Sequence, residues 1–142
     1  MTAPPPRIEL FVRSLAPSEG REGQERAIEL LDALDERDRI AGFELVVSGD
    51  CVCPSLRAAR TAPGRRLLGR YREFERWAAE RDRTLVGFER REVDSALRAE
   101  PVTGISFPRL ALAEYRGDAL AFVAPSRTEG SVATVLERLR EY

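Results

Sequence analysis

Cys51 and Cys53 are the only cysteines of the chain and are separated by a single residue. Two thiols this close can form a strained disulfide, receive a transferred disulfide, or supply two ligands to a shared metal. A zinc site needs about four ligands, and the chain has no histidine and no third cysteine. A metal would therefore require carboxylates or a second subunit. The alternatives are a thiol redox sensor and two reduced thiols, at least one of them buried as a small apolar side chain.

Basic charge is concentrated in the segment Arg57–Arg76, where seven arginines stand against Glu73 and Glu75, a balance of +5. The preceding segment Ser18–Asp50 has ten acids against four arginines, a balance of −6, so the formal net charge of −1 hides a dipolar chain. Arginine suits phosphate and guanine because its planar fork makes paired hydrogen bonds. The candidate nucleic-acid-binding residues are Arg65, Arg66, Arg70, Arg72 and Arg76.

Residues 65–82 have the apolar spacing of an amphipathic helix. Its buried stripe is predicted to be Leu67, Tyr71, Phe74 and Ala78, flanked by Trp77. Arg65, Arg72 and Arg76 fall on the opposite side of the helical wheel and form an outward ridge. The alternative is a solvated helix face in a chain whose 23 basic residues are all arginine.

The residues before this helix could complete a DNA-binding motif. Ser55–Arg60 is predicted as a short helix and Thr61–Gly64 as a turn, so that Arg65 and Arg66 would begin a recognition helix. A helix-turn-helix domain normally packs three helices together, whereas this chain is rich in predicted strands. The helix-turn-helix interpretation therefore depends on this one pair of helices.

The composition excludes several kinds of site. Without histidine, the chain lacks the ordinary acid–base group at neutral pH, the Ser–His and Cys–His nucleophile pairs and the commonest metal ligand. We predict no catalytic residue, no metal and no cofactor, and binding is favoured over catalysis. Two cysteines, no secretory signal and no long apolar run predict a cytoplasmic protein that does not enter the membrane.

The length of 142 residues and the hydrophobic fraction of 43% indicate one globular domain. We expect a disordered proline-rich lead over residues 1–6 and a single α/β domain over residues 7–142. Arg7–Arg13 alternates with a period of two, which predicts a strand with one buried face that turns Glu9 outward. A helix over 22–38 and a second strand over 43–47 complete a unit that usually makes a parallel strand pair.

The second half of the domain is predicted to add strands and a closing helix. A charged edge strand is expected over 85–93. Apolar strands over 105–115 and 119–124, joined by Arg116-Gly117-Asp118, predict a hairpin, and a helix is expected over 129–141. The order β-α-β-α-β-β-β-α predicts a single mixed-sheet α/β domain with helices packed against the sheet.

The segment Ser106–Leu112, with the hairpin and helix after it, resembles the C-terminal half of a thioredoxin-like domain. In that family a cis proline opens a strand of the hairpin and faces the redox site, so the resemblance implies a cis bond at Phe107–Pro108. The family's Cys-x-x-Cys lies in the first strand-to-helix loop, which is Ser14–Gly20 here and contains no cysteine. The resemblance therefore implies a thioredoxin-like outline without thioredoxin catalysis.

Four further segments resemble small proteins of salt-loving archaea that commonly carry a helix-turn-helix label. These segments are Ile8–Leu15, Gly49–Pro54, Phe88–Val93 and Leu110–Tyr115. The resemblance covers nearly the whole chain and implies a transcription-linked, DNA-binding role. It brings no site residues with it.

The sequence thus predicts a non-enzymatic regulatory or interaction protein that binds DNA, a protein partner or a second copy of itself. The alternative is a thioredoxin-like redox sensor that uses Cys51 and Cys53. In a cell interior near molar salt, the screening length falls to about 3 Å and phosphate-driven affinity drops steeply. A segment with a charge of +5 would then need base-specific contacts or a dimer to hold DNA.

Overall fold

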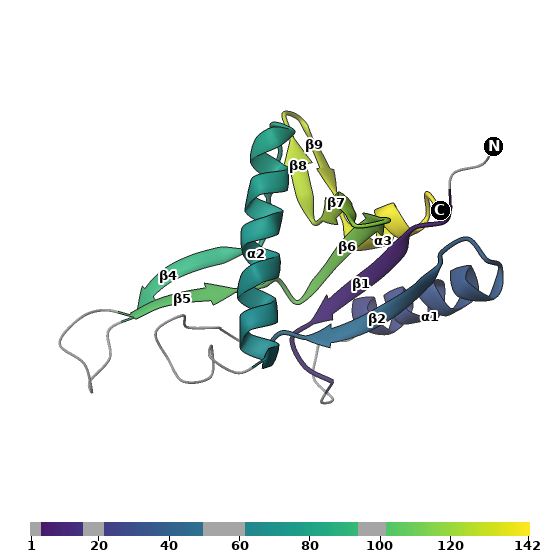
Figure 1. Cartoon of the computed structure of the whole chain (residues 1–142), viewed down its shortest axis with the longest axis horizontal. Helices are drawn as coiled ribbons and strands as arrows, with labels where there is room; N and C mark the ends of the chain where they lie inside the picture. Colours follow the sequence, from purple (N-terminus) through teal and green to yellow (C-terminus); the bar gives the residue numbers. More distant parts are fainter. Residues whose placement is uncertain (1–3, 16–21, 50–61, 94–101) are drawn as a thin grey trace.

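The computed structural model describes residues 4–15, 22–49, 62–93 and 102–142. These residues form a four-stranded sheet with helices on both faces and two smaller sheets beside it (Figure 1). In chain order the elements are β1 (Arg7–Val12), α1 (Glu22–Glu36), β2 (Gly42–Val47), α2 (Ala62–Glu80), β3 (Thr84–Leu85), β4 (Glu89–Val93), β5 (Val102–Ser106), β6 (Leu110–Arg116), β7 (Ala119–Ala124), β8 (Ser126–Thr128), β9 (Ser131–Ala133) and α3 (Val135–Leu139). The predicted mixed α/β class is confirmed. No helix in these ranges is both long and apolar enough to span a membrane.

The main sheet has the strand order β2-β1-β6-β7. β1 runs parallel to β2 and antiparallel to β6, and β6 forms an antiparallel hairpin with β7. The predicted parallel pair and the predicted hairpin are both confirmed. A second sheet contains β3, β8 and β9, while β4 and β5 pair with each other and extend away from the main sheet (Figure 1).

The helix α1 forms because its apolar residues recur at helical spacing and reach one face of the sheet, where Ala27, Leu31 and Leu34 are buried. It ends two residues before the predicted end. Asp38 there adopts a φ of 55°, a left-handed conformation that aspartate tolerates better than most residues. The N–H of Arg39 then donates to the carbonyl of Leu34 at 2.9 Å and closes the helix.

Each face of the main sheet has its own hydrophobic core. The core under α2 includes Phe11, Phe74 and Phe107. The core under α1 and α3 includes Leu10 and Leu112. Because side chains alternate along a strand, β1 and β6 send residues into both cores.

The strand β1 is buried on both faces, and the prediction that Glu9 is exposed is therefore wrong. Every residue from Ile8 to Val12 is buried, since β2 and β6 flank the strand and helices cover both of its sides. Strands in such a position usually consist almost entirely of apolar residues. Within Ile8–Val12, Glu9 is the exception, and its buried carboxylate needs charged or hydrogen-bonding partners inside the protein.

The apolar run predicted as one strand over 105–115 is divided between two sheets. β5 ends at Ser106 and pairs with β4, whereas β6 begins at Leu110 and pairs with β1. Between them, the guanidinium of Arg13 donates to the carbonyl of Phe107 from Nε at 3.0 Å and from Nη2 at 2.9 Å. The strand partners are decided by tertiary contacts, so the sequence pattern does not reveal where the chain changes sheets.

Two further predictions in this half are wrong. The strand expected over 85–93 is interrupted, because β3 pairs with β8 whereas β4 pairs with β5. Gly87 lies in the interruption with a φ of 79°, and a Cβ there would lie 2.9 Å from the Cβ of Pro108. The Phe107–Pro108 bond is not cis, and the cis bond of the described residues is Ala124–Pro125, where the chain bends from β7 into β8.

The closing helix predicted over 129–141 is also largely wrong. Gly130, with a φ of 85°, allows the turn between β8 and β9. The side chain of Thr134 then caps α3, which is limited to Val135–Leu139. Val132 fits the helical spacing but lies on β9 and is 48% exposed.

The short helix α3 is attached to the sheet through a buried carboxylate. Glu114 of β6 is fully buried. Arg138 of α3 donates from Nη2 to Glu114 Oε2 at 2.6 Å, and Arg116 donates from Nη2 to Oε1 at 3.3 Å. The Arg138 guanidinium also lies 4.0 Å from the centroid of the Phe122 ring. A helix of this length is not stable alone in water, so these contacts hold it in place.

The contact between the N-terminal residues and the domain begins before β1. Pro6 is buried, and its carbonyl accepts a hydrogen bond from the N–H of Ala41 at 2.8 Å. Within the lead expected over residues 1–6, the structure thus ties Pro6 to the loop that precedes β2.

Replacing Arg138 with alanine removes the shorter of the two ion pairs to Glu114. We expect the free energy of unfolding to fall by about 2–3 kcal/mol, because a buried carboxylate is left with one longer partner. Arg140→Ala is the matched control, since Arg140 is exposed and only its backbone caps α3. Urea unfolding of the two variants measures the difference, and equal stabilities would show that the Glu114 pair does not hold α3.

Candidate nucleic-acid interface

The predicted apolar stripe of α2 anchors the helix to the sheet. Leu67, Tyr71, Phe74, Trp77 and Ala78 are all buried, as predicted. The Phe74 ring meets the Phe11 ring of β1 edge-on, with centroids 5.6 Å apart, and these contacts fix which side of the helix faces outward.

The helix α2 begins earlier than predicted. Residues 62–64 belong to its first turn, so the turn predicted over Thr61–Gly64 is wrong for these residues. Pro63 is compatible with the helix because proline is tolerated in the first turn, where its missing N–H is not needed. The short helix predicted over Ser55–Arg60 lies outside the described residues.

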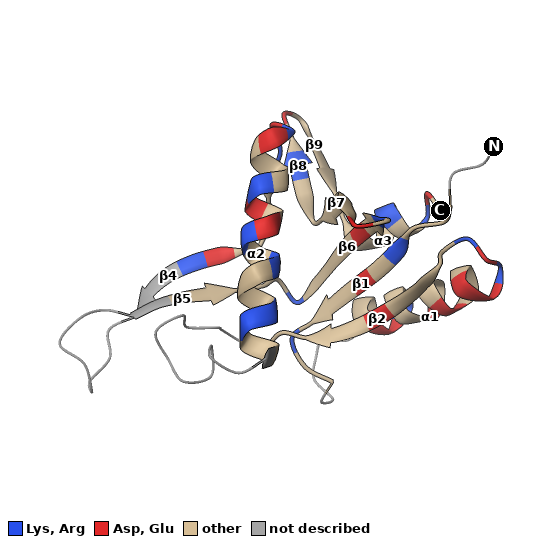
Figure 2. Cartoon of the chain, in the orientation of Figure 1, with Lys and Arg blue, Asp and Glu red and all other residues tan. Residues whose placement is uncertain are grey.

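The outer face of α2 carries a row of free cations. Arg65, Arg72 and Arg76 are exposed and make no ion pair or hydrogen bond through their guanidinium groups in the described part of the chain. Gly69, which lies between them on the same face, has nothing within 4 Å of the position of a Cβ. We call Arg65, Arg72 and Arg76 the arginine ridge; the charged positions of α2 are visible in Figure 2.

The other two predicted arginines, Arg66 and Arg70, bind carboxylates on strands of the main sheet. Arg66 donates from Nη1 and Nη2 to the two carboxylate oxygens of Glu44 on β2, at 2.9 and 2.7 Å. Arg70 donates from Nε and Nη2 to the two oxygens of Glu9 on β1, at 2.8 Å each. Both guanidinium forks are therefore already occupied by carboxylates.

Glu9 is the centre of this polar contact. Its fully buried carboxylate also accepts from Arg7 Nη1 at 2.9 Å and from Arg66 Nη2 at 3.3 Å. Burial raises the pKa of Glu9, but hydrogen bonds and charges from Arg70 and the other arginines outweigh it and hold the pKa below its ordinary value. The pKa of Glu44 is also lowered, chiefly by its hydrogen bonds from Arg66.

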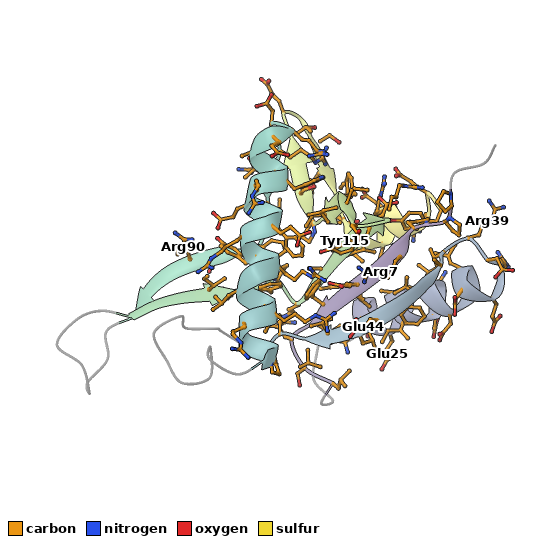
Figure 3. The ribbon with its side chains drawn as sticks, in the orientation of Figure 1. Arg7, Glu25, Arg39, Glu44, Arg90 and Tyr115 are labelled. Carbon is orange, nitrogen blue, oxygen red and sulfur yellow. The ribbon has the colours of Figure 1, made fainter. Side chains whose placement is uncertain are left out.

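The ring of Tyr115 on β6 lies against two of the arginines that bind Glu9. The guanidinium groups of Arg7 and Arg70 lie 4.7 and 4.9 Å from the centroid of its ring, within the range of cation–π attraction. Burial raises the pKa of Tyr115 above its ordinary value. Figure 3 shows Arg7, Glu44 and Tyr115 on the main sheet, with Arg39 further from α2 than any of them. We call Arg7, Glu9, Glu44, Arg66, Arg70 and Tyr115 the sheet clamp.

On the other flank of α2, Arg90 of β4 pairs with Glu75 at 3.4 Å. The pairs on both flanks leave the arginine ridge between them as the open basic surface of the helix. The structure thus divides the five predicted residues into three that face outward and two that hold the helix to the sheet.

Sequence reasoning missed four members of the sheet clamp: Arg7, Glu9, Glu44 and Tyr115. For Glu9 the available signal was the apolar composition of the residues around it, because Ile8, Leu10, Phe11 and Val12 together indicate a strand buried on both faces. Tyr115 carried no comparable signal, since a tyrosine in an apolar strand fits an ordinary core.

The alternative site at Cys51 and Cys53 lies outside the described residues and stays a prediction. The described residues contain no group of three or more acidic, histidine or cysteine side chains that could hold a metal ion. The arginine ridge and the sheet clamp are therefore the arrangements on which a function can be argued.

A family model described as a helix-turn-helix domain matches residues 2–142, so the chain belongs to this helix-turn-helix family. Such domains place a helix in the major groove of DNA, and membership indicates a DNA-binding regulatory role. No curated protein and no solved structure matches the chain. The thioredoxin resemblance therefore gains no support from known structures.

Replacing Glu9 with glutamine tests the electrostatic role of the sheet clamp. The pKa of Glu9 is lowered in the folded state, so its ion pairs stabilise the protein fully above the unfolded pKa of about 4.3 and less as pH falls through the folded pKa. We expect the free energy of unfolding of Glu9→Gln to depend less on pH than that of the parent, between roughly pH 5 and pH 2.

Glu29→Gln is the control for this experiment, because Glu29 lies on the exposed face of α1. Urea titrations across the pH range compare the three proteins. Parallel pH profiles for the parent and Glu9→Gln would show that the clamp does not stabilise the fold through the Glu9 charge.

Proposed function

We propose that this helix-turn-helix family member binds double-stranded DNA through the outer face of α2. The contact residues are Arg65, Arg72 and Arg76. One observation carries the proposal: all three are exposed on a single face of an anchored helix, without a carboxylate partner among the described residues. Arginine forks in such a position can bind phosphate oxygens or guanine edges.

The dimensions of the ridge suit a groove of DNA. From Arg65 to Arg76 the helix rises by about 16 Å, the length available to lie along the groove, and the major groove is about 12 Å wide, which accepts an α-helix about 10–12 Å across. Gly69 leaves the middle of the ridge without a side chain, so the helix backbone can approach the bases closely there.

The sheet clamp supports this proposal by keeping the helix in one orientation. Arg66 donates two hydrogen bonds to Glu44, and Arg70 donates two to Glu9. A contact with DNA would require these charge-assisted hydrogen bonds to break. We therefore assign Arg66 and Arg70 to positioning, which narrows the five predicted DNA contacts to three.

The charge of the opposite face also favours one direction of approach. α1 packs on the other side of the sheet from α2. Its exposed acidic residues are Glu22, Glu25, Glu29, Asp32, Asp35 and Glu36, and Figure 2 shows acidic positions on α1 in red. A DNA duplex is repelled by that face and attracted to the ridge, so the charge distribution orients the encounter.

Replacing the three ridge residues together, Arg65→Ala, Arg72→Ala and Arg76→Ala, tests the proposal. We expect DNA affinity to fall roughly tenfold or more at low salt, because three phosphate or base contacts are lost. The slope of log affinity against log salt concentration should flatten by about 2–3. Fluorescence anisotropy with labelled duplex DNA over a salt series measures both quantities.

The control removes the same charge elsewhere, through Arg37→Ala, Arg39→Ala and Arg140→Ala, which are also exposed. This control should bind DNA nearly as well as the parent. A third protein with lysine at the three ridge positions keeps the charge but not the fork, so its loss of affinity measures paired hydrogen bonding. Equal weakening in the ridge and control proteins, or no DNA binding by the parent at any salt, would overturn the proposal.

A further inference from the structure

The strand β2 ends the main sheet on one side. It pairs with β1 along one edge, and no strand of the described chain pairs with its other edge. Leu45 and Val47 of this strand are 37% and 47% exposed, although both are large apolar residues. Proteins usually protect such an edge with charge, proline or a bulge.

Within the described residues, the main-chain groups on the outer edge of β2 have no strand to pair with. At the end of the strand, the N–H of Ser48 donates to the carbonyl of Val12 on β1 at 2.8 Å. Since main-chain groups alternate in direction along a strand, those of Phe43, Leu45 and Val47 point away from β1. The same alternation places these three side chains together on the α1 face of the sheet, level with Ile8, Leu10 and Val12 of β1.

We propose that β2 pairs with β2 of a second copy of this chain, antiparallel and about a twofold axis that passes midway between the two Leu45 residues. In this register Leu45 lies opposite Leu45 of the other copy, and Phe43 lies opposite Val47. The two four-stranded sheets then form one continuous sheet.

The edge is complementary to itself, which is the reason for choosing a second copy as the partner. The three residue pairs with outward main-chain groups make about six hydrogen bonds. Their side chains form one apolar stripe on the α1 face. Glu44, the single charged residue of β2, faces Val46 of the other copy rather than a second carboxylate, and its own carboxylate is held by Arg66.

The axis of this pairing runs perpendicular to the sheet, so each copy keeps its helices on the same side. Both α2 helices therefore lie on one side of the joined sheet, and both acidic α1 helices lie on the other. This arrangement places the two arginine ridges on one side, where one duplex can contact both. Its relevance to DNA binding rests on the proposed function. The pairing itself does not depend on DNA and is tested without it.

The oligomeric state is the first test. Sedimentation velocity of the parent over a dilution series is expected to show a species of twice the chain mass of 15.9 kDa. Leu45→Pro removes an N–H that points away from β1, which an edge strand tolerates but a second strand does not. Leu45→Lys places a charge on the apolar stripe at the axis. Circular dichroism identifies which variants fold, and every folded one should be a monomer.

Cross-linking tests the register. In a Cys51→Ser, Cys53→Ser background, Leu45→Cys places two thiols in a directly paired position, with Cα atoms about 5.5 Å apart and within reach of a disulfide. Val47→Cys is the matched control, because its two thiols would lie four residues apart along the strand, about 13 Å. Mild oxidation should give a covalent dimer for Leu45→Cys and little for Val47→Cys.

The possible outcomes are distinguishable. A parent that is a monomer at every concentration overturns the pairing. A dimer that survives Leu45→Lys, or equal cross-linking at positions 45 and 47, places the interface elsewhere and also overturns it. If the dimer is found but the ridge variants bind DNA like the parent, the proposed function fails while the pairing stands.

Discussion

Two buried carboxylates, one on each face of the main sheet, determine how the helices of this protein are attached. Glu9 of β1 points under α2, and Glu114 of β6 points under α3. Their neighbours across the strand pair are Ala113 and Ile8, so the two glutamates lie close along the sheet but on opposite faces. An unpaired carboxylate in such a position is strongly destabilising. The fold therefore requires arginines from the covering helices to reach the sheet.

This requirement separates the arginines by role. Arg70 and Arg66 hold α2 through paired hydrogen bonds that a lysine ammonium cannot reproduce. Arg138 performs the equivalent task for α3. The residues of the arginine ridge are free of such pairs in the described chain, and their charge is available for a ligand. The same residue type thus serves internal attachment and an external surface on one helix.

The sequence allowed the parts of the fold that depend on simple periodicity to be predicted. The stripe of α2, the parallel pair and the hairpin each follow from spacing that one element alone determines. The run over 105–115 and the helix over 129–141 could not be divided correctly, because tertiary pairing with β4, β1 and β8 decides where those strands begin and end. The alternating pattern likewise led to the wrong prediction that Glu9 is exposed, because the pattern of one strand does not show that helices cover both of its faces.

For the candidate site, the helical wheel placed Arg65, Arg72 and Arg76 on the outward side, but the sequence could not show that Arg66 and Arg70 bind carboxylates of the sheet. Arg70 and Arg72 are two positions apart, and only their angle around the helix separates a residue that reaches Glu9 from one that faces solvent. Glu9, the partner of Arg70 on β1, lies 61 residues earlier in the chain. Such a contact depends on the assembled sheet and not on local pattern.

A comparison of Arg70→Ala with Arg72→Ala tests this account most directly, because both changes remove one positive charge from the same helix. Unfolding free energy and DNA affinity are measured for each folded variant. Arg70→Ala should lose about 2–4 kcal/mol of stability and keep the DNA affinity of the parent. Arg72→Ala should keep its stability and lose DNA affinity. If both variants lose DNA affinity equally, or if Arg70→Ala is as stable as Arg72→Ala, the division between clamp and ridge is wrong.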